Sequence, residues 1–165
     1  MKYAIVFSSK TGNTRQLAEA VRAALPAADC LYFGQPAPAA LAAERLYVGF
    51  WTDKGSCDAE TAAFLQQITT QKVFLFGTAG FGGESAYFER ILASAKALLP
   101  ERSAVLGGYM CQGRMPAAVR RRYEKMMEGP DPASNAGRMI ENFDRALAHP
   151  DETDLARLKA AVLAL

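Results

Sequence analysis

The sequence predicts an α/β protein in which a doubly wound, five-stranded parallel sheet forms the middle of three layers, with extra helices at the C-terminus. Three observations predict this class. Five short apolar runs alternate with amphipathic segments that have helical spacing. Glycine, serine or proline bounds most of the runs. The chain has 165 residues, which is the length of one domain.

The five apolar runs are the predicted strands. They are apolar at nearly every position, as is typical of parallel strands that are buried on both faces. Right-handed crossovers favour the strand order 2-1-3-4-5, which places a ligand at the carboxyl ends of strands 1 and 3, where the winding reverses. The strands span residues 2–7, 29–33, 45–51, 72–77 and 103–110.

The segments between the strands predict helices. In the first, Leu17 and Val21 lie on one face, and Pro26 ends the helix. A long amphipathic helix before the last strand ends at Pro100. Residues 35–43 are rich in proline and alanine, so we expect a loop or a weak helical turn there. The predicted helices span residues 14–25, 58–68, 84–99, 116–128, 134–147 and 151–164.

The last three of these helices are polar and follow the final strand. Residues 129–132, Gly-Pro-Asp-Pro, separate the first from the second. His149 and Pro150 separate the second from the third. We interpret His149, the only histidine, as part of this linker, and the alternative is a Ser-His-Asp triad. We assign residues 1–165 to a single domain, with residues 151–165 as a C-terminal helical extension.

Composition excludes several classes of protein. Hydrophobic residues make up 50% of the chain, yet no apolar run approaches the roughly 18 residues of a membrane span. The apolar start is too short for a secretion signal, so we expect a cytoplasmic protein with reduced thiols. A net charge of +2 is too mild to indicate nucleic-acid binding. Cys30, Cys57 and Cys111 lack the spacing of a metal site, so we expect no metal.

One dense basic cluster, Arg120 to Arg122, lies in the first of the C-terminal helices. The simpler interpretation is a solvated helix face. The alternative is a docking patch for an acidic partner or an anionic substrate.

The loop after strand 1 carries the clearest chemical signal. Residues 8–14, Ser-Ser-Lys-Thr-Gly-Asn-Thr, run directly into a helix. Backbone N–H groups and the dipole at a helix start favour an anion, and the hydroxyl groups add donors for a phosphate monoester. The alternative is an ordinary turn that Thr11 or Asn13 caps. Neither the nucleoside-triphosphate loop nor the dinucleotide fingerprint is present.

The loops after strands 3 and 4 have features of a site for a flat ligand. Trp51, the only tryptophan, ends strand 3, where its ring could stack on a planar heteroaromatic group or instead enter the core. Residues 77–83 contain four glycines and Phe81, so the backbone could approach a flat ligand closely. The alternative for that loop is a flexible linker.

The loop after strand 5 begins with Cys111, Gln112, Gly113 and Arg114. A catalytic thiol at Cys111 is one interpretation. A structural or substrate-adjacent cysteine is favoured, because no nearby basic residue is evident that would stabilise a thiolate.

Residues 9–14 match the [ST]-x-T-G-x-T phosphate loop of flavodoxins, and the chain resembles the short-chain members of that family. The resemblance implies a flavodoxin-like fold and flavin mononucleotide (FMN) as the cofactor. Residues 9–14 would hold the phosphate, while residues 50–55 and 78–81 would flank the isoalloxazine ring. By this resemblance the cofactor-binding residues are Ser9, Lys10, Thr11, Gly12, Asn13, Thr14, Phe50, Trp51, Thr52, Asp53, Lys54, Gly55, Thr78, Ala79, Gly80 and Phe81.

A narrower resemblance rests on the strings VGFWTDKGS, LFGT, CQGR and AHPDETDL. They are similar to a group of flavodoxin-like proteins from anaerobic bacteria, some of which are associated with bilirubin reduction. The chain departs from electron-shuttle flavodoxins in its mildly basic charge, in Lys54 near the expected ring, and in its extra C-terminal segment.

The resemblance implies a protein that transfers electrons between redox partners. One alternative is an FMN-dependent reductase that acts directly on a quinone or a tetrapyrrole, in a pocket lined by Phe81, Tyr109, Met110 and Arg114. A receiver-type signalling module is disfavoured, because strand 1 ends in Ser and Lys instead of acidic residues. We expect the backbone around Lys54 to respond to flavin reduction, and Lys54→Glu to make the flavin potential more negative.

Overall fold

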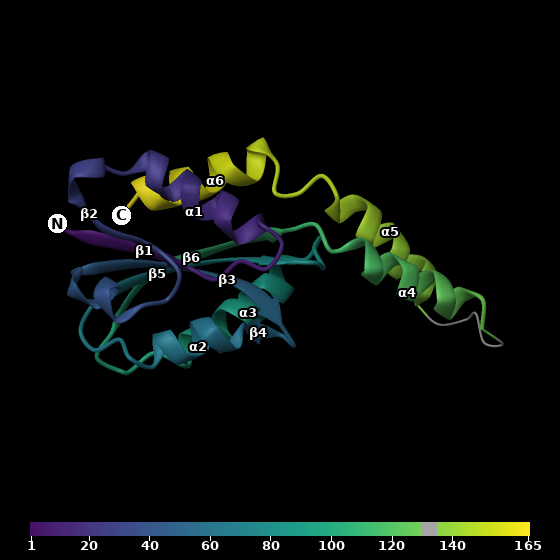
Figure 1. Ribbon diagram of the computed structural model, residues 1–165, viewed down its shortest axis with the longest axis horizontal. Coiled ribbons are helices and arrows are strands. Elements are labelled where there is room, and N and C mark those ends of the chain that lie inside the picture. The colour runs from purple at the N-terminus through teal and green to yellow at the C-terminus, as the bar shows by residue number, and fades with distance from the viewer. Residues whose placement is uncertain (130–134) are drawn as a thin grey trace.

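The computed structural model describes residues 1–129 and 135–165. Its sheet has the order β2-β1-β3-β5-β6, with parallel pairing throughout this path (Figure 1). The predicted order is confirmed, since β5 and β6 are the fourth and fifth predicted strands. The strands are β1 (Tyr3–Phe7), β2 (Cys30–Gly34), β3 (Arg45–Asp53), β4 (Ser56–Cys57), β5 (Lys72–Ala79) and β6 (Ala104–Gln112).

The short strand β4 was not predicted. It pairs antiparallel with the end of β3, where Thr52 faces Cys57 and Asp53 faces Ser56. The turn between them has positive φ at both central residues, 50° at Lys54 and 81° at Gly55. Two-residue hairpin turns favour this backbone. The sequence signal for it is one glycine, and β4 has only two residues, so periodicity could not reveal it.

Helices cover both faces of the sheet (Figure 1). α1 and α6 lie on one face, and α2 and α3 lie on the other. Residues 35–43, expected as a loop or weak turn, contain the 3₁₀ helix η2, and a shorter one, η1, precedes β2. The helical elements are α1 (Asn13–Ala24), η1 (Ala27–Asp29), η2 (Pro38–Ala42), α2 (Ala59–Leu65), α3 (Ser85–Lys96), α4 (Ala117–Met127), α5 (Ala136–Ala146) and α6 (Glu152–Leu163).

The central strands divide their side chains between two cores. In β1, Ile5 joins the cluster under α1 and α6, whereas Val6 joins the cluster under α2 and α3. Both are fully buried, as residues on opposite faces of a central strand should be. This burial holds the carboxyl ends of β1, β3 and β5 in fixed relative positions.

The last helix completes the layer beside α1. Leu158 and Val162 of α6 pack in the same core as Leu17 and Val21 of α1. Residues 151–165, which the sequence interpretation named an extension, therefore help to cover the sheet. The additional part of the chain is the segment between β6 and α6.

That segment is a helical hairpin that projects from the end of the sheet (Figure 1). We call α4 and α5 together the arm. Arg120 of α4 forms ion pairs with Asp144 of α5 and with Glu124 of its own helix. The predicted Gly-Pro-Asp-Pro break begins at Gly129, and its residues 130–132 lie outside the described residues.

In the described part of the chain, none of the helices has both the length and the apolar character needed to cross a bilayer. Cys30, Cys57 and Cys111 are all free thiols.

Candidate functional site

A cavity of about 520 Å³ opens where the loops after β1, β3 and β5 meet the base of the arm. It lies at the carboxyl edge of the sheet, the position that the strand order predicted. Eleven of the residues predicted to bind a cofactor line it. They are Lys10, Thr11, Asn13, Trp51, Thr52, Lys54, Gly55, Thr78, Ala79, Gly80 and Phe81.

The other five predicted residues do not line this cavity. Ser9 and Gly12 line a separate hollow with Phe33 and neighbouring residues. Thr14 is buried, and Phe50 is 0% exposed in the core under α2 and α3. Asp53 lies in the hairpin between β3 and β4.

The loop from Ser9 to Thr14 turns into α1 through Gly12, which has a φ of 89° and lies at the N-cap position. A side chain is disfavoured in that conformation, which explains the glycine of the motif. The first turn of α1 contains no acidic residue. Among the described residues, the backbone N–H groups of Thr11 to Thr14 make no hydrogen bonds. The start of the helix therefore offers several free donors to an anion.

The hydroxyl groups of the loop have different roles. Thr14 Oγ1 donates to the carbonyl oxygen of Phe50 at 3.2 Å and lies 3.2 Å from Thr78 Oγ1, so it ties the ends of β3 and β5 to α1. Ser9 Oγ accepts from the N–H of Arg15 at 3.3 Å. Thr11 is exposed and lines the cavity. Of these hydroxyls, that of Thr11 is the one placed to meet a ligand.

Asn13 connects the loop to the base of the arm. Its Nδ2 donates to the carbonyl oxygen of Arg114 at 2.8 Å. Its Oδ1 is buried and has no hydrogen-bond partner among the described residues. Buried polar atoms are rarely left unpaired, so this acceptor at the cavity wall indicates a missing donor.

Trp51 lies half-buried at the end of β3 and lines the cavity. The ammonium group of Lys10 lies over its ring, 4.9 Å from the centroid. The indole thus does not enter the core, which was the alternative interpretation. One face of the ring carries a cation–π contact that an exposed lysine can release at little cost.

The loop after β5 is fixed by hydrogen bonds to the arm and to β6. The carbonyl oxygen of Gly80 accepts from Asn142 Nδ2 of α5 and from Gln112 Nε2, both at 2.9 Å. A Cβ atom at Gly80 would lie 2.5 Å from the sulfur of Met115, so a larger residue there would require the Met115 side chain to move. At Gly80 the loop thus packs closely and is held by two hydrogen bonds, which disfavours the flexible-linker interpretation at this position.

Eight further residues line the cavity and were not among the predicted cofactor-binding residues. Seven of them lie in the loop after β6 or in α4. They were not predicted, because the segment after β6 gives no periodic signal that it folds back over the site. Arg114 was considered only for a substrate pocket, and Arg122 only as part of the basic cluster. The eight are Tyr87, Gly113, Arg114, Met115, Pro116, Ala118, Val119 and Arg122.

The pocket expected from Phe81, Tyr109, Met110 and Arg114 does not form as one space. Phe81 and Arg114 line the cavity described above. Tyr109 and Met110 line a second cavity of about 640 Å³ beside β6 and the start of α3. The feature that would have favoured the alternative of a direct reductase is therefore not found, because Tyr109 and Met110 precede the end of β6, whereas Phe81 and Arg114 follow strand ends.

Cys111 is not an activated nucleophile. Its thiol is buried, and burial raises its pKa far above the usual range, with a further increase from the carboxylates of Asp154 and Asp151. A thiolate needs a nearby cation or an exposed position. The favoured interpretation, a structural or substrate-adjacent cysteine, agrees with this environment.

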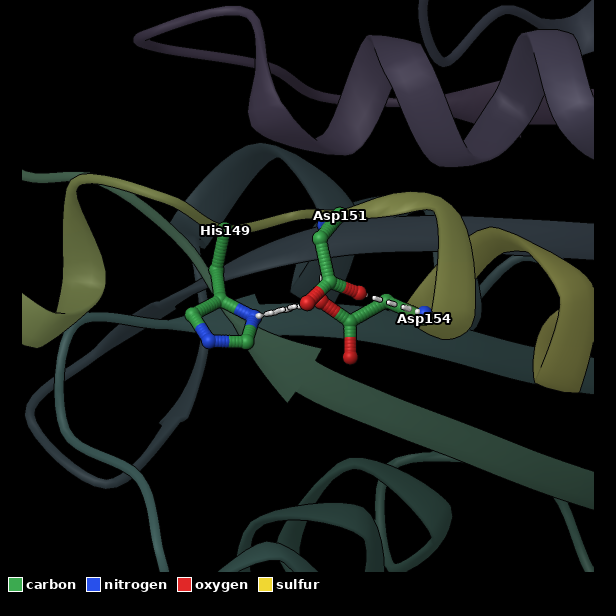
Figure 2. Close-up of side chains that lie close together, drawn as sticks. All are labelled: His149, Asp151 and Asp154. Carbon is green, nitrogen blue, oxygen red and sulfur yellow. Dashed lines mark hydrogen bonds and ion pairs between the residues drawn. The ribbon is translucent and has the colours of Figure 1, made fainter.

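His149 lies in the linker between α5 and α6, as predicted, and Figure 2 shows the two carboxylates beside it. Its Nδ1 is 2.6 Å from Asp154 Oδ2 and 3.7 Å from Asp151 Oδ2. Asp151 and Asp154 form a capping box in which each carboxylate accepts the backbone N–H of the other residue. These bonds lower the pKa of Asp151, chiefly through the Asp154 amide. The three side chains have ligand atoms within 4.8 Å of one another, and helix capping accounts for the arrangement of the two carboxylates.

The flavodoxin domain family matches residues 4–163 of the chain. The chain belongs to this family. It is 43% identical to the flavodoxin-like domain-containing protein BilS of Clostridium symbiosum (strain WAL-14163), over 94% of this chain and 91% of that protein. The predicted resemblance to flavodoxins is confirmed, and so is the resemblance to a narrower flavodoxin-like group.

Solved structures show the same fold at low sequence identity. The flavodoxin of Streptococcus pneumoniae TIGR4 aligns with 99% of this chain and 96% of its own, at a TM-score of 0.61 and 14% identity. A flavoprotein from Lactobacillus acidophilus NCFM, solved in complex with FMN, aligns with 66% of this chain and 92% of its own, at a TM-score of 0.53 and 12% identity.

Proposed function

We propose that the chain binds FMN at the carboxyl edge of its sheet and transfers electrons between redox partners. The observation that carries this proposal is the cavity, which joins the start of α1 to the aromatic side chains of Trp51 and Phe81. Such a cavity suits a ligand that has a phosphate group at one end and a flat ring at the other. The family to which the chain belongs, and the FMN complex of the Lactobacillus flavoprotein, support the same ligand.

The phosphate end is assigned to the loop before α1. The backbone N–H groups of Thr11 to Thr14 have no partner among the described residues, and the α1 dipole favours negative charge there. Thr11 contributes an exposed hydroxyl. Lys10 adds a positive charge, and its ammonium group contacts the Trp51 ring. These groups bind a phosphate without a metal ion.

The ring end is assigned to the loops after β3 and β5. Trp51 lines the cavity from the end of β3, Phe81 from the loop after β5, and Tyr87 from α3. Aromatic stacking adds about 0.5–1.5 kcal/mol beyond the burial of area. The isoalloxazine ring supplies the redox chemistry, while the protein orients it and sets its potential. Lys54 lines the cavity, so we expect its positive charge to raise the reduction potential of the flavin.

The role as an electron carrier is favoured over direct reduction of a small molecule. The second role requires a substrate pocket over the ring, and the residues considered for it are divided between two cavities. Steady-state kinetics separates the two roles. An electron carrier gives no turnover with a reduced nicotinamide and a quinone or tetrapyrrole alone, whereas a direct reductase turns over without any partner protein.

FMN binding is tested by titrating the apoprotein with FMN and with riboflavin and following flavin fluorescence. We expect FMN to bind at micromolar levels or tighter and riboflavin to bind more weakly. Thr11→Ala should weaken FMN about 10- to 100-fold, since a hydrogen bond to a charged group contributes about 1.5–3 kcal/mol, and should leave riboflavin unchanged.

Thr70→Ala is the matched control, because Thr70 is exposed and lies at the opposite edge of the sheet, just before β5. Equal loss of FMN affinity in both variants would contradict the assignment of the phosphate to the loop before α1. Failure of the wild-type chain to bind FMN would contradict the function itself.

A further inference from the structure

We propose that α4 is a docking surface for an acidic patch on a partner protein. Ala118, Arg121, Arg122 and Lys125 are spaced i, i+3, i+4 and i+7, so they form one stripe along the helix. The stripe is about 10 Å long at 1.5 Å per residue. Ala118 and Arg122 line the cavity, so the stripe begins at the edge of the proposed flavin site.

The charge of the stripe is concentrated and exposed. Arg121, Arg122 and Lys125 are all exposed, and none forms an ion pair with another described residue. α4 contains four cationic side chains and one carboxylate, so its net charge exceeds the +2 of the whole chain. Like charges at these spacings destabilise a helix, and an acidic partner would relieve that repulsion.

The remaining charges of α4 belong to the opposite face of the helix. Arg120 bonds to Asp144 of α5 and to Glu124 of its own helix. These bonds raise the pKa of Arg120 and lower that of Asp144, chiefly through the hydrogen bond that joins them. One face of α4 is therefore used to hold the arm together, which leaves the face with Arg121, Arg122 and Lys125 for another molecule.

The arm is connected to the site by direct hydrogen bonds. Asn142 of α5 donates to the carbonyl oxygen of Gly80 in the loop after β5, and Asn13 donates to the carbonyl oxygen of Arg114 at the start of the arm. Asn142 is itself buried. A partner seated on the stripe is thus placed at a fixed position relative to the cavity, as electron transfer over a short distance requires.

The surface favours a protein over a nucleic acid. Met126, four residues after Arg122 and therefore next to the stripe, is 40% exposed, and a flexible apolar side chain of this kind suits a protein interface. Three cations over about 10 Å are fewer than the phosphate contacts that most nucleic-acid complexes make. Because this inference identifies the partner of the proposed flavin site, it rests on the proposed function.

The first experiment probes the electrostatic potential around the proposed flavin site with two small oxidants of opposite charge. The FMN-loaded protein is reduced anaerobically and mixed with ferricyanide, a trianion, or hexaammineruthenium(III), a trication, and two equivalents of either ion take up the two electrons of the reduced flavin. As NaCl rises from about 20 to about 500 mM, the rate with ferricyanide should fall about tenfold and the rate with the trication should rise. The Arg121→Glu, Arg122→Glu, Lys125→Glu variant should reverse both trends.

The second experiment does not need the cofactor. Fluorescence anisotropy follows binding of a labelled peptide of glutamate residues to the full-length apoprotein, with a labelled single-stranded oligonucleotide in parallel. We expect the charge-reversal variant to lose at least about tenfold in peptide affinity. A variant with glutamine at the same three positions should lose an intermediate amount of peptide affinity. It replaces the charge-reversal variant in this measurement if charge reversal perturbs folding.

The matched control reverses three exposed cations at the opposite end of the sheet, Lys72→Glu, Lys96→Glu and Arg102→Glu, which changes the net charge equally. The docking surface is overturned if both triple variants behave alike, or if the oligonucleotide binds more tightly than the peptide. Absence of bound flavin would overturn the proposed function alone, because the peptide measurement would still decide the role of the stripe.

Discussion

The α/β body and the arm meet at the cavity but are held together by different forces. In the body, Val48 of β3 and Leu75 of β5 are fully buried, and Thr14 hydrogen-bonds across strand ends. In the arm, α4 contains no buried residue and is tied to α5 by the ion pair of Arg120 with Asp144, while the burial in the arm is confined to α5, as at Phe143. The body therefore fixes the geometry of the site, whereas the arm adds a wall that polar contacts at its base hold in place.

The contact between the two regions shows how an insertion can be joined to an existing site. Asn142 and Asn13 supply side-chain hydrogen bonds from either side of the joint, and Met115 packs on the backbone of Gly80. A few directional contacts thus place the base of the arm, and most of its length projects away from the sheet (Figure 1).

The largest effect is expected in the body. Phe76 is fully buried in the core under α1 and α6, so Phe76→Ala should lower the free energy of unfolding by about 3–5 kcal/mol. Met127→Ala in the arm, where the side chain is 46% exposed, should change it by about 0.5 kcal/mol or less. Urea unfolding measures both, and similar losses in the two variants would contradict the contrast.

A smaller effect is expected where the body shapes the site. Thr14→Val removes the buried hydroxyl that joins Phe50 to Thr78, and should cost about 1–3 kcal/mol of unfolding free energy. FMN affinity should fall as well, because the ends of β3 and β5 are no longer tied to α1. An unchanged unfolding midpoint together with unchanged FMN affinity would show that this hydroxyl does not organise the site.

The smallest effect on global stability is expected in the arm. Arg120→Ala removes the link to Asp144 and Glu124, so amide hydrogen exchange should accelerate in α4 and α5 while the body exchanges as before. Arg121→Ala, on the outer face of the same helix, is the control and should leave exchange unchanged. Faster exchange throughout the chain would mean that the arm is integral to the body.

The same link gives the arm a pH dependence. Arg120 holds the pKa of Asp144 below its ordinary value. A lowered folded-state pKa stabilises the arm above the unfolded pKa of the carboxyl, and this contribution is lost as the pH falls through the folded value. Exchange in α4 and α5 should therefore accelerate in acid, and Asp144→Asn should remove that response. An acid response that survives in Asp144→Asn would assign it to another group.

The sequence predicted the body well because its signals are local and repeated. Apolar runs such as residues 72–77 give β5, and the hydroxyl-rich motif before α1 marks the edge where ligands bind. It predicted less of the site wall, since Arg122 and Met115 reach the cavity only through the fold of an insertion. Gly80 illustrates this limit of sequence-based prediction, because Met115, which packs against it, is 35 residues away in the chain.

The central claim, that FMN occupies this cavity, is tested most directly through Trp51, the only tryptophan of the chain and a residue of the cavity wall. Its emission is recorded while FMN is added to the apoprotein. We predict that tryptophan and flavin emission are both quenched, with an endpoint at one FMN per chain. Tryptophan emission that stays constant, apart from simple light absorption by the flavin, would contradict the claim.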